Sequence, residues 1–140
     1  MLFRSALVRT RNAMLETQAR GFETLRTAQV ALGRGVRVML ARKGFASVAA
    51  EGFQAPSVVV SYTTDPDLSN TKKMLAQGLQ IAAGVPLQCD EGDDFRSFRV
   101  GLFGLDKLGN VERSVRSLEQ ALDLSLGLAL GTVPDRKSVV

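Results

Sequence analysis

The sequence predicts an α/β protein of the two-layer α+β type: a long N-terminal helix, then a small, mainly antiparallel sheet with helices on one face. Three observations support this fold class. Apolar residues recur at helical spacing near the N-terminus, short β-branched or alternating runs follow, and a second amphipathic pattern comes near the C-terminus. The 140 residues suit one domain, and a hydrophobic content of 45% allows an ordinary core.

The long helix is predicted over residues 12–43, where apolar side chains recur at spacings of three, four and seven. These side chains are Leu15, Phe22, Leu25, Leu32, Val36 and Met39. Gly33 and Gly35 are expected to bend this helix, and Gly44 suits the position just after a helix end. A helix of this length is expected to link two bodies, and residues 1–11 are expected to form a terminal segment before it.

The middle of the chain is predicted to alternate short strands with one short helix. Strands are expected at 45–50 and 57–62, because β-branched residues flank a loop that contains glycine and proline. Residues 70–80 suit a short helix. The extended piece at 81–88 contains Pro86, which places it at an edge of the sheet or at a bulge.

A last strand and a last helix complete the pattern. The alternating segment FRSFRVGLFG (95–104) predicts a strand with two different faces. One face holds Phe98, Val100 and Leu102, and the other holds Ser97, Arg99, Gly101 and Phe103. Asn110 is expected to cap a helix over 111–126. Residues 44–125 thus form the body of the predicted domain, and 126–140 form a tail.

Arg99 is the candidate functional residue of the strand at 95–104. Its neighbours on the same face, Ser97 and Gly101, are small, so open space is expected above the guanidinium group. On the residues alone, this arginine is expected on the solvent face of the sheet, since most arginines are exposed.

Composition excludes several kinds of site. The chain has no histidine and a single cysteine, Cys89, which rules out Ser-His-Asp and Cys-His catalysis, histidine-rich metal sites and an intrachain disulfide. A reducing, cytoplasmic compartment fits this cysteine content. The acidic run Asp90–Asp94 lacks the ligand spacing of a calcium loop, so a solvated turn and no metal site are predicted. No apolar run reaches the length of a membrane span, so no membrane partner is expected.

The net charge of +4 raises the question of a nucleic-acid partner. The basic residues are spread from Arg4 to Lys137 and form no cluster with aromatic residues, so no nucleic acid is expected. The arginine-rich, acid-free stretch before Glu16 is typical of a mitochondrial transit peptide. An arginine-rich helix start is the alternative that we prefer.

Three blocks of the sequence resemble a known family. They are GFASVAAEGFQAPSVVVSYTTDPDL, KKMLAQGLQIAAGVPLQCDE and FRVGLFGLDKLGNVERSV. In this order they resemble the C-terminal small domain of class V, fold-type I, pyridoxal-phosphate-dependent aminotransferases, and most of all the alanine–glyoxylate and serine–pyruvate group. The likeness extends from about Gly21 to Asp123, which is only the last third or so of such an enzyme. The chain is therefore expected to be a fragment.

The resemblance implies roles for two residues. In these enzymes an arginine at the FRVG position binds the α-carboxylate of the substrate, a role that falls on Arg99. A guanidinium group suits it, because it bonds both carboxylate oxygens and stays charged. Gly84 is implied as backbone of the substrate pocket, and a glycine that merely permits a bulge is the alternative. The implied reaction moves an amino group from alanine or serine to glyoxylate or pyruvate.

The resemblance also implies pyridoxal 5′-phosphate as cofactor of a homodimeric, cytoplasmic parent enzyme. Its Schiff-base lysine, pyridinium acid and phosphate donors belong to a large domain upstream of this segment. The lysines here, none in the expected context, are Lys43, Lys72, Lys73, Lys107 and Lys137. The chain alone is therefore predicted to be inactive, with no catalytic, cofactor-binding or metal-binding residue of its own.

Two further expectations concern the chain as a whole. The alternative function is a stand-alone α+β module that binds small carboxylates or regulates, without catalysis. The terminal stretches LFRS (2–5) and DRKSVV (135–140) match what sequencing adapters encode when translated. Part of the first segment and the last six residues are therefore expected to be non-native.

Overall fold

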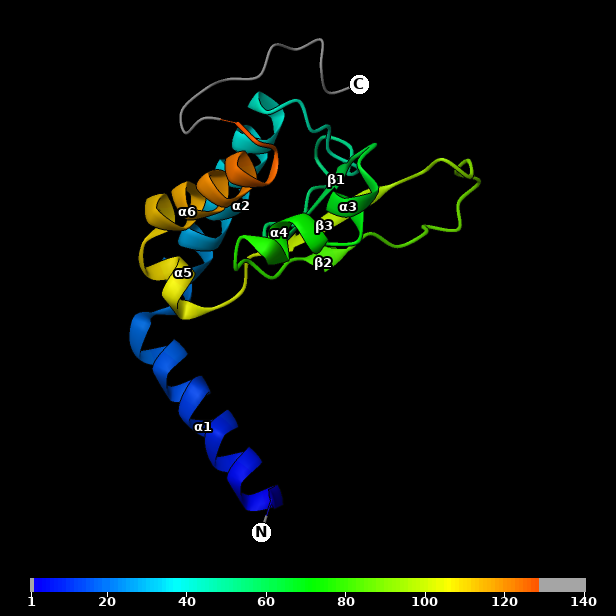
Figure 1. Cartoon of the computed structure of the whole chain (residues 1–140). Coiled ribbons are helices and arrows are strands. Elements are labelled where there is room, and N and C mark those ends of the chain that lie inside the picture. Colours follow the sequence, from blue (N-terminus) through cyan, green and yellow to red (C-terminus); the bar gives the residue numbers. More distant parts are fainter. Residues whose placement is uncertain (1, 129–140) are drawn as a thin grey trace.

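A computed structural model describes residues 2–128, with side chains from Ser5 onward, and shows a small sheet beside a layer of helices (Figure 1). The helices are α1 (Leu2–Arg20), α2 (Phe22–Arg42), α3 (Pro66–Ser69), α4 (Lys72–Ala76), α5 (Leu105–Gly109) and α6 (Val111–Ser125). The strands are β1 (Val58–Tyr62), β2 (Ala82–Ala83) and β3 (Ser97–Gly101). The sheet order is β1-β3-β2 and both pairs are antiparallel, which confirms the predicted α+β fold class.

The core lies between one face of the sheet and the helix layer. Alternate residues of β3, Phe98 and Val100, are buried there together with Val59 of β1. Helix α2 contributes three fully buried side chains, Leu32, Val36 and Met39. Burial of each side chain of this size contributes about 1.5–3 kcal/mol. The apolar face predicted for the strand at 95–104 is therefore confirmed.

The single helix predicted over 12–43 is wrong, because the chain forms two helices that meet at Gly21. The φ of Gly21 is 85°, which lies outside the α-helical region. Glycine adopts such a positive φ at little cost because it has no Cβ. Helix α1 also covers nearly all of the predicted terminal segment 1–11. The glycines expected to bend the helix lie inside α2 without interrupting it. At Gly33 a Cβ would lie 2.4 Å from the carbonyl oxygen of Pro56, so this glycine permits a close approach instead of a bend.

The strand predicted at 45–50 is also wrong. Within it only Ser47 forms a bridge, to Ser61 of β1, and backbone hydrogen bonds to β1 are limited to the flanking Ala46 and Val48. The chain turns where the N–H of Phe53 donates to the carbonyl oxygen of Ala50. The described part of the chain therefore contains three strands instead of the four extended segments that the sequence predicts.

The other predicted elements are confirmed with shorter bounds. The extended piece with Pro86 supplies β2 at an edge of the sheet, and the strand with Arg99 supplies the central β3. Gly44 follows the end of α2 with a φ of 88°. Asn110 caps α6, where its Oδ1 accepts a hydrogen bond from the N–H of Arg113 at 2.9 Å.

A buried ion pair joins the C-terminal ends of α2 and α6. Lys43 Nζ lies 2.6 Å from Asp123 Oδ1, and the two residues are 4% and 2% exposed. Glu119 Oε1 lies 3.4 Å from the same nitrogen. Because charges lose their hydration on burial, removal of either partner leaves a charge without compensation.

Replacing Lys43 with Met is expected to lower the free energy of unfolding by about 3–5 kcal/mol, because Asp123 stays buried without its cation. The double variant Lys43→Met/Asp123→Leu should recover most of this loss, since no uncompensated charge remains. Urea unfolding followed by circular dichroism measures both quantities.

Arg42→Met is the matched control. Arg42 is exposed and lies 3.7 Å from Glu119, so its loss should cost no more than about 1 kcal/mol. Equal losses in the Arg42 and Lys43 variants, or no recovery in the double variant, would contradict the role given to the buried pair.

Candidate functional site

Arg99 lies in the middle of β3, on the face that points away from the core. Its partners across the sheet are Val60 of β1 and Ala82 of β2. The side chain is half-buried, and its Nε donates a hydrogen bond to the carbonyl oxygen of Ala83 at 2.9 Å. Within residues 2–128, its two Nη groups have neither an ion pair nor a hydrogen bond. The backbone of β2 therefore orients the guanidinium group and leaves its outer donors free.

The open space expected on both sides of Arg99 is present on one side. Gly101 is exposed, and a Cβ there would meet nothing closer than the ring of Phe103 at 3.6 Å. Ser97, on the other side, is 2% exposed because the chain itself covers it. An approaching ligand has room from the Gly101 side.

Gly84 lies directly against the backbone of β3. A Cβ at this position would lie 2.0 Å from the carbonyl oxygen of Ser97, closer than real atoms approach. Two hydrogen bonds fix this contact: the N–H of Gly84 donates to Ser69 O at 3.2 Å, and Ser69 Oγ donates to Ser97 O at 2.9 Å. The absent side chain therefore serves the packing of β2 and α3 on β3.

Gly84 and Arg99 are neighbours along the sheet but do not line one cavity. Gly84 borders a hollow of about 290 Å³ that is also lined by Ser97, Glu91 and Arg96. Arg99 does not line this hollow and meets Gly84 only through the intervening Ala83. The structure thus gives Gly84 a packing role of its own, whether or not a substrate comes near.

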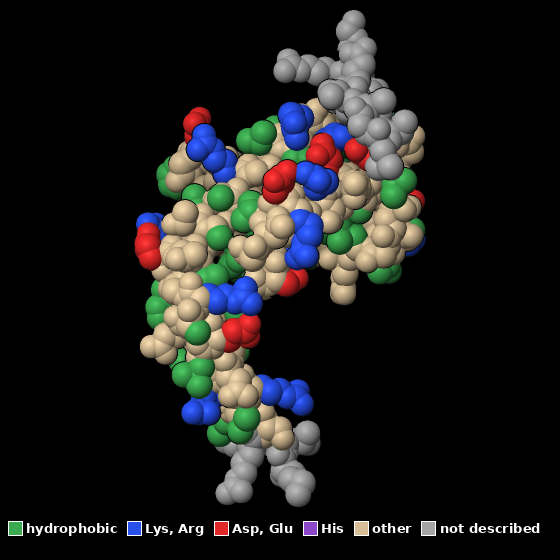
Figure 2. Space-filling view, turned by 90° about the vertical axis from the view of Figure 1, so that its left-hand side faces the viewer, with side chains coloured by type: hydrophobic (Ala, Val, Ile, Leu, Met, Phe, Trp, Pro, Cys, Tyr) green, Lys and Arg blue, Asp and Glu red, His purple; other side chains and the backbone are tan. Residues whose placement is uncertain are grey.

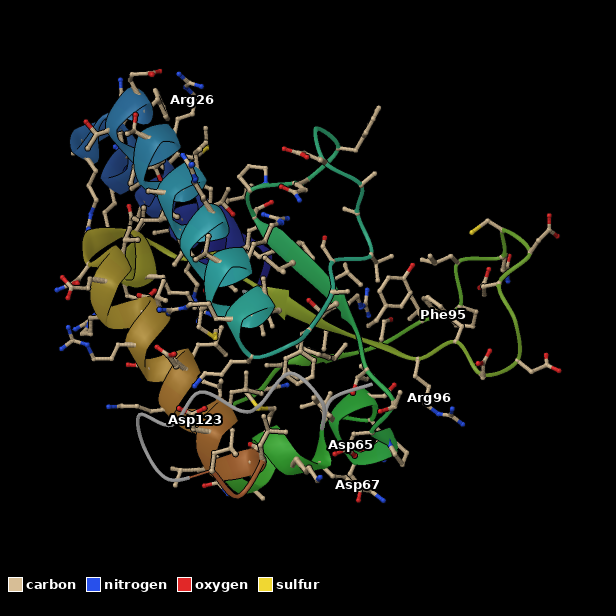
Figure 3. The ribbon with its side chains drawn as sticks, turned by 90° about the horizontal axis from the view of Figure 1, so that it is seen from above. Arg26, Asp65, Asp67, Phe95, Arg96 and Asp123 are labelled. Carbon is tan, nitrogen blue, oxygen red and sulfur yellow. The ribbon has the colours of Figure 1, made fainter. Side chains whose placement is uncertain are left out.

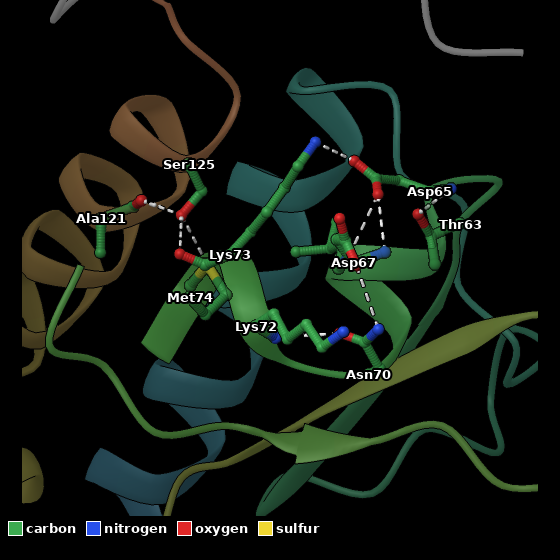
Figure 4. A network of polar contacts seen from close by, with 10 residues as sticks. Thr63, Asp65, Asp67, Asn70, Lys72, Lys73, Met74, Ala121 and Ser125 are labelled. Carbon is green, nitrogen blue, oxygen red and sulfur yellow. Dashed lines mark hydrogen bonds and ion pairs between the residues drawn. The ribbon is translucent and has the colours of Figure 1, made fainter. Parts of the chain in front are cut away.

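Helix α3 holds Ser69 in place, and Asp65 organises this helix. The Oδ1 atom of Asp65 accepts hydrogen bonds from the N–H groups of Asp67 and Leu68, and its Oδ2 atom pairs with Lys73 of α4 (Figure 4). Burial alone would raise the pKa of Asp65. The hydrogen bonds from Lys73 and from the two backbone N–H groups outweigh burial, so the pKa lies below its ordinary value of 3.8.

The loop between β2 and β3 projects beyond the sheet, and Glu91 organises it. Phe95 and Arg96 lie where this loop joins β3 (Figure 3). The carboxylate of Glu91 accepts hydrogen bonds from the backbone N–H groups of Cys89, Gln88 and Leu87, which lower its pKa to about 2. The predicted solvated turn is present here. The spacing of the acidic residues did not indicate that Glu91 would hold the backbone of this loop.

Cys89 lies exposed in the same loop. Desolvation, and then the neighbouring Glu91 carboxylate, raise the pKa of its thiol. A raised pKa leaves less thiolate at neutral pH, so the surroundings do not prepare this cysteine for nucleophilic attack.

The described lysines do not form a site for a covalently bound pyridoxal phosphate. Lys43 is held in the buried ion pair, Lys73 pairs with Asp65, and Lys107 Nζ donates to a backbone oxygen at 2.8 Å. Lys72 is exposed on α4. Lys137 lies outside the described residues. The residues present therefore do not fit the cofactor, and no chemical step through it can be derived from this chain.

Residues 2–128 contain no cluster of three or more histidine, cysteine or acidic side chains that could hold a metal ion. In the same part of the chain, every helix is too short or too polar to cross a lipid bilayer.

Comparison with models of protein families and with curated proteins found no match for this chain. The aminotransferase resemblance of the sequence therefore stays a prediction, and so do the roles of Arg99 and Gly84 that depend on it.

Replacing Gly84 with Ala is expected to lower the free energy of unfolding by about 1–3 kcal/mol, because the Ser97 carbonyl that the new Cβ would meet is part of β3 and cannot move freely. Gly101→Ala, on the neighbouring strand, is the control and should change stability by less than about 0.5 kcal/mol. Urea unfolding of both variants tests this, and a Gly84 variant as stable as the control would count against the close packing.

Asp65→Asn should remove the charge and keep a side chain that can cap α3. At neutral pH this variant should lower the free energy of unfolding by at most about 1 kcal/mol. Solvent screens the ion pair, since the side chains of Asp65 and Lys73 are 26% and 38% exposed. The folded-state pKa of Asp65 is lowered, so its stabilising effect is complete above the unfolded-state pKa and is lost as the pH falls through the folded-state value.

The stability difference between the wild type and Asp65→Asn should therefore shrink as the pH is lowered below 3.8. Urea unfolding at a series of pH values measures it. Asp67→Asn, which has no lysine partner among the described residues, serves as the control. A difference between wild type and Asp65→Asn that does not vary with pH would rule out the assigned ion pair.

Proposed function

We propose that this chain is the small C-terminal domain of a class V pyridoxal-phosphate-dependent aminotransferase, in which Arg99 holds the α-carboxylate of the substrate. The observation that carries the proposal is the state of the Arg99 guanidinium group. Its Nε is anchored on Ala83 O, while its outer nitrogens have no carboxylate partner within residues 2–128. An arginine oriented in this way offers two N–H donors that match the two oxygens of a carboxylate.

The parent enzyme would move an amino group from alanine or serine to glyoxylate or pyruvate. Pyridoxal phosphate would supply the electron sink and would be bound by the large domain, because the lysines described here are unsuited to it. The contribution of this chain is to fix the substrate by its carboxylate, and the chain alone is inactive. We place the parent enzyme in the cytoplasm as a homodimer.

The apolar surface of α1 and the start of α2 supports a missing neighbour. Helix α1 projects from the rest of the molecule, and basic and hydrophobic side chains are interspersed on it (Figures 1 and 2). Its exposed hydrophobic residues are Leu7, Val8, Met14 and Leu15, and Phe22 follows at the start of α2 with 66% exposure. Several exposed hydrophobic side chains on one projecting helix are consistent with an interface, and a large domain would cover them.

A stand-alone module that binds small carboxylates is the second candidate. The continuous core between α2, α6 and the sheet favours it, since an independent module must bury its own core. The two candidates differ in whether the apolar face of α1 is covered by another domain of the same chain.

Arg99→Ala should raise the KM for both the amino acid and the oxo acid roughly a hundredfold in the parent enzyme, because a buried carboxylate loses its charged partner. The parent enzyme is obtained by joining this segment to the coding sequence that precedes it. Steady-state kinetics measure the KM, and the absorbance of the bound cofactor should stay unchanged.

Arg96→Ala is the matched control, because Arg96 lies three residues away and is exposed, and among residues 2–128 its side chain donates only to Asp94 O. Its KM values should equal those of the wild type. Unchanged KM values in the Arg99 variant would refute the assigned role. A preceding sequence that encodes no large domain would favour the stand-alone module.

A further inference from the structure

We propose that a hollow between the end of β3, α5 and α6 binds a small anion with an apolar body, of the class of short-chain aliphatic carboxylates. This site is separate from Arg99, and the inference does not depend on the aminotransferase proposal.

The floor of the hollow is apolar and comes from several segments that the fold brings together. It is formed by Leu32 of α2, Leu79 and Ile81 before β2, Val100 and Leu102 around the end of β3, and Leu118 of α6. Its volume is about 230 Å³. Sites for drug-sized ligands span about 300–1,000 Å³, so this hollow suits a compact molecule.

The rim of the hollow carries two cations and one acid. Lys107 of α5 donates to Phe103 O at 2.8 Å, and Arg113 of α6 donates to Asp106 O at 3.4 Å. Both partners are backbone carbonyl groups, and within residues 2–128 neither cation has an ion pair. The side chain of Asp106 also lines the hollow, which leaves one net positive charge at the rim. An anionic head group is therefore favoured over a neutral one.

A hydroxyl and an amide complete the polar rim. Ser117 follows Arg113 by one turn of α6, so both side chains lie on one side of that helix. The side chains of Ser117 and Gln80 are exposed and have no hydrogen bond within the described residues. A carboxylate at the rim would meet Arg113, Lys107 and Ser117 while its alkyl chain covers the apolar floor. An apolar floor with a few convergent polar groups is the usual form of a small-molecule site.

Titration of the isotope-labelled full chain with hexanoate tests the proposal by NMR. Saturable shifts are expected at the methyl groups of Ile81, Val100 and Leu118. Hexanol, which has no charge, and acetate, which has almost no apolar body, should each bind about tenfold more weakly than hexanoate. Arg113→Gln should lower the affinity for hexanoate about tenfold and leave the affinity for hexanol unchanged.

Arg116→Gln is the matched control on α6. Arg116 pairs with Glu112 at 2.5 Å and does not line the hollow, so hexanoate binding should be unchanged. Ser117→Leu should abolish binding of both ligands by filling the space, and its circular dichroism spectrum shows whether it folds. Arg99→Ala should bind hexanoate as the wild type does, whatever the result for the parent enzyme.

Four outcomes would overturn the proposal: no saturable shift with hexanoate, equal affinity for hexanol, an equal loss in the Arg113 and Arg116 variants, or shifts centred on Arg99. Loss of hexanoate binding in a folded Ser117 variant, together with its retention in the Arg99 variant, would support the site independently of any aminotransferase activity.

Discussion

The ion pair between Lys43 and Asp123 fixes the helix layer on which the sheet is built. Separation of the two charges would leave each of them buried without compensation, which disfavours movement of α2 against α6. Lys43 Nζ and Asp123 Oδ1 lie 2.6 Å apart and join the ends of α2 and α6, and α2 packs its apolar side against the sheet. Phe98 and Val100 pack on that surface, and because side chains alternate along a strand, Arg99 must point to the opposite face. The position of the candidate site thus follows from the packing of Phe98 and Val100 on the helix layer.

Local sequence patterns predicted the structure correctly where the conformation of a residue depends on its neighbours in the chain. The alternation at 95–104 predicted the burial of Phe98 and Val100 but not that of Ser97, and the polar residue Asn110 predicted the start of α6. The break at Gly21 could not be predicted, because apolar spacing continues on both sides of it and a glycine alone does not show the sign of φ. The strand predicted at 45–50 failed for another reason: a strand needs a partner along its length, and only one bridge, at Ser47 with hydrogen bonds at Ala46 and Val48, joins this segment to β1.

The candidate site was predictable in part for the same physical reason. The sequence placed Arg99 on the open face. For Gly84 the resemblance implied a substrate pocket and the alternative was a bulge, so the close packing on Ser97 was missed. Ser69 was missed as the link between β2 and β3, since its contacts join residues that are far apart in the chain. The short helix that carries Ser69, α3, was also not predicted from the sequence. Lys43 and Asp123 gave no signal, because a lysine at a helix end is ordinarily solvated.

The break at Gly21 makes α1 a lever. A helix of 19 residues is about 28 Å long, so a rotation of about 20° at the glycine displaces the far end by about 10 Å. The few backbone torsions around one residue without a side chain therefore determine where the first helix is presented. A change of the torsion angles at Gly21 would therefore move the N-terminal end of α1 a long way without moving the sheet or Arg99.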